Sequence, residues 1–248
     1  MQDKLKFVLQ ECLRGQISLD FAYNDYMPTV FQVETECALC GTISEQSVAG
    51  PVERHGLPDL DTRPPEEVRS TLPYWIQACP NCGYCAPNID LDYPLADSVI
   101  HQESYQALLR RRSLPQAARR FMAWAQIQAS NDEHTGAGWS ALHAAWACDD
   151  AGKPGPAASC RLSALEHFEN ARRGRPSLPG FEEAGTGEIL LADLCRRADQ
   201  FGRTVEISRQ GLAAHPTEVV VRTLEREIVL ALAGDNAAHS LAEVAEVE

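Results

Sequence analysis

Apolar residues recur every three or four positions from about His101 to the end of the chain. This spacing places them on one face of an α-helix, and clusters of glycine and proline interrupt it at Gly152–Pro156, Gly174–Gly180 and His215–Pro216. Helices joined by such short turns favour antiparallel hairpins. The pattern predicts helices over Ser104–Arg112, Pro115–Ser130, Gly138–Ala151, Pro156–Arg173, Gly187–Phe201, Arg203–His215 and Glu218–Ala233.

The pattern is different before His101. The first 30 residues predict a short helix, Leu5–Leu13, and a polar linker. Residues 31–98 hold many prolines, two cysteine pairs and short strand-like runs such as Tyr74-Trp75-Ile76. This composition is typical of a small, loop-rich module that needs a bound metal to stabilise its fold. We therefore expect an α+β protein in three parts: an N-terminal helix and linker (1–30), a zinc-ribbon-like module (31–98) and an all-α region of helical hairpins (101–248).

The two cysteine pairs carry the clearest chemistry. Cys37 and Cys40 form one C-x-x-C pair, Cys79 and Cys82 form another after 38 residues, and a glycine follows each. Two such turns supply the four sulfurs of a tetrahedral structural zinc site, whereas a catalytic zinc keeps one position open for water. We expect one Zn²⁺ in a structural role, bound by Cys37, Cys40, Cys79 and Cys82.

Cys85 leaves an alternative open. With Cys82 it forms an overlapping C-x-x-C pair that resembles the dithiol of an oxidoreductase. No βαβ pattern precedes this pair and Pro87 follows it closely, so we favour a buried thiol or a spare ligand. His55 could replace one thiolate, although a solvated loop position is the simpler interpretation. The cysteines that lie on apolar helix faces are expected in the core: Cys12, Cys148, Cys160 and Cys195.

The predicted hairpins resemble tetratricopeptide repeats, whose pattern spans about 34 residues and ends in a proline. Aligning that proline with Pro216 puts small residues at the positions where two helices pack closely. An ordinary helical bundle is the alternative, and we favour the repeat, which stacks into a short solenoid with a concave groove. The residues that carry the pattern are Thr204, Ser208 and Gly211 in one copy and Trp139, Leu142 and Trp146 in an earlier one.

The ribbon and the helices together resemble a bacterial family known as domain of unknown function 2225. The similar segments are Cys37-Ala-Leu-Cys40-Gly41, Tyr74-Trp75, Cys79-Pro-Asn-Cys82-Gly83-Tyr84 and the helical tail. The resemblance covers most of the chain and implies a zinc ribbon joined to tetratricopeptide-like helices. It implies no activity.

Charge and composition narrow the function classes. With 35 acidic against 22 basic residues among 248, the chain has a formal charge of −13, which repels phosphate backbones and disfavours nucleic-acid binding. No apolar run approaches the roughly 20 residues of a membrane span, and the N-terminus lacks the apolar run of a secretory signal. We therefore expect a cytoplasmic protein without a membrane partner, whose nine cysteines are metal ligands and free thiols rather than disulfides.

Two charged stretches have open interpretations. The stretch from Asp59 to Glu67, which includes Asp61 and Arg63, predicts either a binding loop or a solvated loop stiffened by proline. Arg110–Arg112, with two arginines that follow at 119 and 120, predicts a basic face. That face could meet an acidic partner, a phosphate or the protein's own carboxylates.

Together these features favour a non-enzymatic interaction or scaffold protein in which zinc holds the ribbon and the helical groove binds a protein or peptide. The main alternative is a thiol–disulfide oxidoreductase, or another zinc or thiol enzyme, that uses Cys82 and Cys85. Nucleic-acid binding by the zinc ribbon is the second alternative. Trp75, Trp139 and Trp146 would anchor a partner if exposed, but we expect them in the core.

Overall fold

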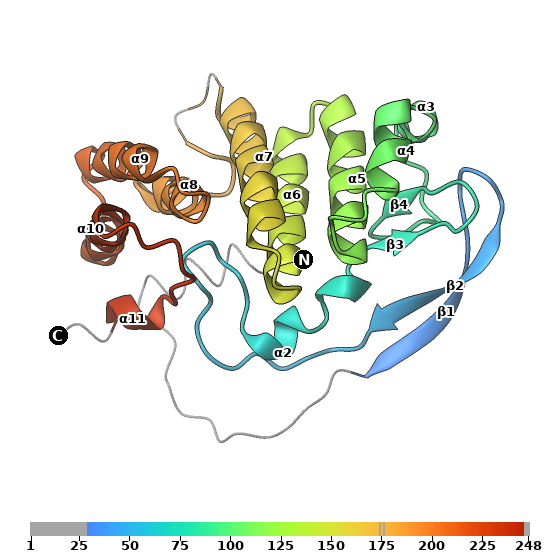
Figure 1. Ribbon diagram of the computed structural model, residues 1–248, viewed down its shortest axis with the longest axis horizontal. Helices are drawn as coiled ribbons and strands as arrows, with labels where there is room; N and C mark the ends of the chain where they lie inside the picture. Colours follow the sequence, from blue (N-terminus) through green and yellow to red (C-terminus); the bar gives the residue numbers. More distant parts are fainter. Residues whose placement is uncertain (1–28, 174, 176, 246–248) are drawn as a thin grey trace. The chain divides into compact units, whose positions relative to one another are not determined.

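The computed structural model describes residues 29–173, 175 and 177–245. The architecture is α+β: two small antiparallel sheets precede a series of helices (Figure 1). The predicted helix Leu5–Leu13 lies outside the described residues. The elements are β1 (Val30–Glu36), β2 (Ile43–Ala49), α2 (Glu66–Arg69), the 3₁₀ helix η1 (Leu72–Tyr74), β3 (Gln77–Ala78), β4 (Cys85–Ala86), α3 (Ala96–Ile100), α4 (Glu103–Leu109), α5 (Gln116–Ser130), α6 (His134–Asp150), α7 (Pro154–Arg172), α8 (Thr186–Arg196), α9 (Phe201–Ala213), α10 (Glu218–Leu232) and α11 (Ala242–Ala245).

The chain divides into two compact units. The cysteine unit consists of the described residues of Tyr26–Glu53 together with Glu67–His167, and the C-terminal unit consists of Arg54–Glu66 and the described residues of Phe168–Glu248. This division reflects which residues pack together in space, and it does not coincide with the boundaries expected from the sequence pattern. The three-part domain organisation expected from the sequence stays a prediction.

In the cysteine unit, two hairpins and a helical pair form the framework. Strands β1 and β2 pair antiparallel from Val30 opposite Ala49 to Glu36 opposite Ile43, and the short strands β3 and β4 pair in the same way. Helices α5 and α6 pack against each other, and α3, α4 and β4 contact α5. Trp139 and Trp146 are buried, as expected from the sequence.

The prediction of a strand at Tyr74-Trp75-Ile76 is wrong. The segment Leu72–Tyr74 is a 3₁₀ helix, and the Trp75 amide donates to the Leu72 carbonyl. The Trp75 indole also donates to Thr71 Oγ1 at 2.7 Å. Pro73 has no amide hydrogen to give to a strand partner, so it fits the first turn of a helix better than a sheet interior.

In the C-terminal unit, α8, α9 and α10 pack on one another. All seven helices predicted from the spacing of apolar residues are present, and most of their ends lie within a few residues of the expected positions. The largest error is the helix predicted to end at Phe201, because α8 already ends at Arg196. Asp199 adopts a left-handed conformation with φ 59°, which breaks the helix before α9 begins.

The first part of the charged stretch from Asp59 to Glu67 does not fit the solvated-loop alternative, whereas the binding-loop alternative stays a prediction. Leu60 and Asp61 are buried, and Asp61 pairs with Arg197 of the C-terminal unit at 3.2 Å. Leu60 donates its amide to His239, and a β-bridge joins Asp59 to Ser240. Residues 60–62 are therefore part of the core of the C-terminal unit.

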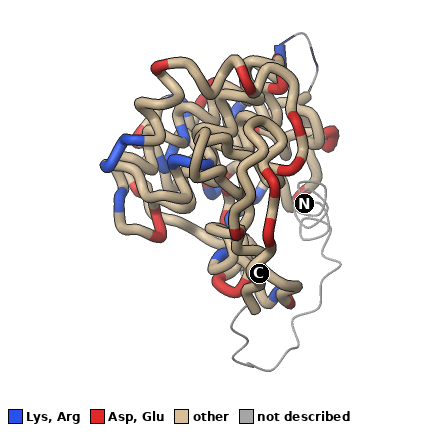
Figure 2. The backbone as a smooth tube through the Cα atoms, turned by 90° about the vertical axis from the view of Figure 1, so that its right-hand side faces the viewer, with Lys and Arg blue, Asp and Glu red and all other residues tan. Residues whose placement is uncertain are grey.

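Acidic positions and fewer basic positions are interspersed along the described chain (Figure 2), and residues 104–131 carry only basic charges. This distribution agrees with the formal charge of −13. Within the described residues, the structure contains no helix with the length and apolar character needed to cross a bilayer.

Candidate metal centre

Each predicted cysteine pair lies in the turn of a hairpin. The first pair occupies the turn between β1 and β2, and the second occupies the turn between β3 and β4. In the first turn, Cys37 donates its amide to Thr42 and accepts from the amide of Gly41. The second turn repeats this arrangement, with Cys79 donating to the Tyr84 carbonyl and accepting from the Gly83 amide. The same local sequence therefore forms the same turn twice.

The two turns bring four thiols together. Cys37 Sγ lies 3.8 Å from Cys82 Sγ, and Cys40 Sγ lies 3.5 Å from Cys79 Sγ. All four sulfurs lie within 4.8 Å of one another, and none of them is in a disulfide. A tetrahedral site with metal–sulfur distances of about 2.3 Å places its sulfurs about 3.8 Å apart. The arrangement therefore has the size that one metal ion with four thiolate ligands requires.

Electrostatics also fit a cation at the centre of this cluster. Burial raises the pKa of Cys37 and of Cys82, which disfavours the thiolate in both. The hydroxyl and amide of Thr42, by contrast, lower the pKa of Cys40 to about 6. Backbone amides of Leu39 and Cys40 also point at the Cys37 sulfur. The positive charge of a bound divalent cation would stabilise these buried thiolates.

Residues outside the two turns hold them in place. The side chain of Gln46 in β2 donates to the Ala78 carbonyl at 3.2 Å and accepts from the Ala78 amide at 3.3 Å, so it joins the first hairpin to the second. Tyr105 of α4 donates to the Gly83 carbonyl at 3.0 Å and accepts from the Cys85 amide at 3.1 Å. Sequence reasoning missed both residues, because a lone glutamine or tyrosine carries no signal without its partner.

Replacing each of the two glycines in these turns by alanine should lower the free energy of unfolding by different amounts. Both have left-handed backbones, with φ +69° at Gly41 and φ +79° at Gly83. A Cβ at Gly41 would meet no atom closer than 3.8 Å, whereas at Gly83 it would lie 2.8 Å from Leu109 Cδ1. We expect Gly41→Ala to lower the free energy of unfolding by about 1–2 kcal/mol from backbone strain alone. Gly83→Ala should cost clearly more, as measured by urea denaturation of the metal-loaded protein, and equal costs would contradict this reading.

The structure disfavours a redox role for Cys85. Its side chain is fully buried, its sulfur donates to the Gly83 carbonyl at 3.4 Å, and burial raises its pKa to about 12. A thiol nucleophile needs the opposite, namely partial exposure and a lowered pKa. The metal cluster contains neither Cys85 nor His55. Cys148, Cys160 and Cys195 are buried as predicted, and Cys12 lies outside the described residues.

Comparisons of the chain with protein-family models, with curated proteins and with solved structures found no match. The resemblance to domain of unknown function 2225 therefore stays a prediction from the sequence.

Proposed function

We propose that Cys37, Cys40, Cys79 and Cys82 hold a structural zinc ion, and that the protein is a non-enzymatic interaction module whose helices bind a protein or peptide. The observation that carries the zinc assignment is the group of four thiols within 4.8 Å of one another. Four cysteine thiolates are the usual ligands of structural zinc. They leave no coordination position for water or substrate, which favours a structural role over a catalytic one.

The helical hairpins support the interaction role. At the positions expected for close packing in a tetratricopeptide-like hairpin, Thr204, Ser208 and Gly211 of α9 are buried. A Cβ at Gly211 would lie 2.8 Å from both Glu188 Cβ and Leu224 Cδ1, so α9 lies very close to α8 and α10 there. Such tight pairing is what a stack of hairpins with a binding groove requires.

Metal analysis tests the zinc assignment. Protein purified under reducing conditions should contain one tightly bound zinc per chain. The Cys37→Ser variant should lose it, because three ligands no longer close the site, and Cys85→Ser should retain it as the matched control. Protein without metal, or with iron in place of zinc, would refute the assignment.

The interaction role needs a separate experiment. The full-length protein is purified with its partners from native cells at physiological salt, and each identified protein is tested for binding again in pure form. We expect at least one such protein to rebind. Two results would contradict the proposal: steeply salt-dependent binding of RNA or DNA without a protein partner, or cycling of Cys82 and Cys85 between dithiol and disulfide.

A further inference from the structure

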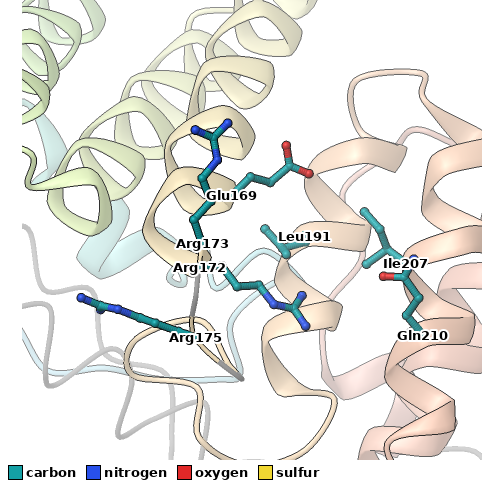
Figure 3. Close-up of a pocket in the computed structure, with 7 residues that line it drawn as sticks. All are labelled: Glu169, Arg172, Arg173, Arg175, Leu191, Ile207 and Gln210. Carbon is teal, nitrogen blue, oxygen red and sulfur yellow. The ribbon is translucent and has the colours of Figure 1, made fainter.

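A small pocket of the C-terminal unit lies between the last turn of α7 and helices α8 and α9 (Figure 3). Its volume is about 330 Å³, which is at the lower end of the range for ligand pockets. Leu191 of α8 and Ile207 of α9 form an apolar floor, and both are largely buried. This space suits one or two amino-acid side chains rather than a large cofactor.

The mouth of the pocket is basic. Arg172 at the end of α7, and Arg173 and Arg175 just after it, line the pocket together with Gln210. Figure 3 shows Arg172 extending past Leu191 toward Gln210, while Arg173 and Arg175 project from the end of α7 in other directions. The latter two are exposed, so their long side chains can turn toward a ligand without repacking the core.

The two carboxylates near the mouth of the pocket each pair with an arginine other than Arg173 or Arg175. Arg172 pairs with Glu188 at 2.6 Å, and Glu169 pairs with Arg203. In the part of the chain that the structure describes, Arg173 and Arg175 have no ion-pair partner. Two arginines without a carboxylate partner among the described residues, beside an apolar floor, are notable in a chain with 35 acidic and 22 basic residues.

We propose that this pocket binds an acidic peptide segment, with an apolar side chain on Leu191 and Ile207 and a neighbouring carboxylate on Arg173 and Arg175. Guanidinium groups bind carboxylates through strong, charge-assisted hydrogen bonds. A free phosphate would make no use of the apolar floor, and nucleic acid is repelled by the formal charge of −13. This inference rests on the proposed interaction role and specifies the chemistry of the partner.

The test is fluorescence polarisation with an array of short labelled peptides, in which aspartate or glutamate stands next to leucine, isoleucine, valine or phenylalanine. We expect some of these peptides to bind, and their glutamine or asparagine counterparts to bind about tenfold more weakly or worse, since a guanidinium binds a charged carboxylate more strongly than a neutral amide. Inorganic phosphate at physiological concentration should not displace the peptides. If no acidic peptide of the array binds, or if phosphate displaces them, the proposal is wrong.

A matched pair of variants locates the site. Arg173→Glu with Arg175→Glu should weaken the best peptide at least about tenfold. Arg110→Glu with Arg112→Glu makes the same change of charge at exposed positions of the cysteine unit and should leave binding unchanged. Equal losses in both variants would mean that only net charge matters, and thermal unfolding shows whether each variant is folded. A native partner that rebinds both variants alike would leave the interaction role standing and refute this pocket.

Discussion

The Cys79→Ser variant is expected to lose tight zinc binding and to unfold the part of the cysteine unit that is built on β1–β4. Cys79 is buried, and its sulfur lies 3.5 Å from that of Cys40. Strands β3 and β4 have only two residues each, which is too little pairing to stand alone. Binding of structural zinc contributes about 10–16 kcal/mol in small zinc domains, which is comparable with the total stability of a typical domain, about 5–15 kcal/mol.

The measurement combines zinc content with thermal unfolding. Wild-type protein should melt at a much lower temperature after treatment with a strong chelator, and Cys79→Ser should melt like the chelated wild type whether or not zinc is added. Cys85→Ser is the control, because its sulfur is buried nearby but lies outside the four-thiol group. If Cys79→Ser keeps both the zinc and the wild-type melting temperature, the cluster does not hold the fold together.

The features that could be predicted from the sequence are local ones. Helices α5, α9 and α10 follow from the spacing of apolar residues and from the turns between them, because both signals lie within a short stretch of chain. The four cysteines could be identified as one group because two copies of the same turn predict matched ligands. Their convergence within 4.8 Å agrees with that prediction, while the identity of the metal stays a proposal.

The features that could not be predicted depend on partners far away in the chain. The pairing of Asp61 with Arg197 is one example, because nothing near Asp61 in the sequence indicates it. Nothing in the sequence around Gln46 marks this residue, yet its amide group links β2 to the backbone of Ala78. Rules based on the spacing of residues describe one helix or strand at a time, so they do not show which side chains link two elements.

A buried ion cluster in the C-terminal unit is the strongest case of such a long-range contact, and Arg196 is its centre. The side chains of Arg196, Asp193 and Glu227 are almost completely inaccessible to solvent. Arg196 donates to Glu227 at 3.0 Å, to Asp193, and to the backbone carbonyls of Asp235 and Ala237 at 2.8 and 2.9 Å. One side chain therefore joins α8 to α10 and to the segment that follows it.

Burial raises the pKa of Glu227 well above its usual value of 4.5, and the nearby charge of Asp193 raises it further. The Glu227 and Asp193 carboxyl groups lie within hydrogen-bonding reach of each other, so the retained proton can join them. The folded state therefore binds this proton more tightly than the unfolded state does. The contribution of this proton to the free energy of unfolding is fully present below pH 4.5. It is lost as the pH rises through the pKa of Glu227 in the folded protein.

These contacts predict losses of stability of very different size for two substitutions in the same cluster. Arg196→Met should lower the free energy of unfolding by about 3–5 kcal/mol, because it leaves buried carboxyl and carbonyl groups without their donor. Glu227→Gln should cost much less, since a neutral amide can accept from Arg196 and donate to Asp193 as the protonated acid does. It should also remove this residue's share of the stability loss above pH 4.5.

Urea denaturation of both variants over a range of pH values measures these effects. Arg203→Met is the matched control, because Arg203 also pairs with a glutamate, Glu169, but both side chains are 42% exposed. Exposed pairs contribute about 0–1 kcal/mol, so the same change of residue should have little effect there. If Arg196→Met were as mild as Arg203→Met, the buried cluster would add no stability. If Glu227→Gln were as costly as Arg196→Met, the proton would not lie on Glu227.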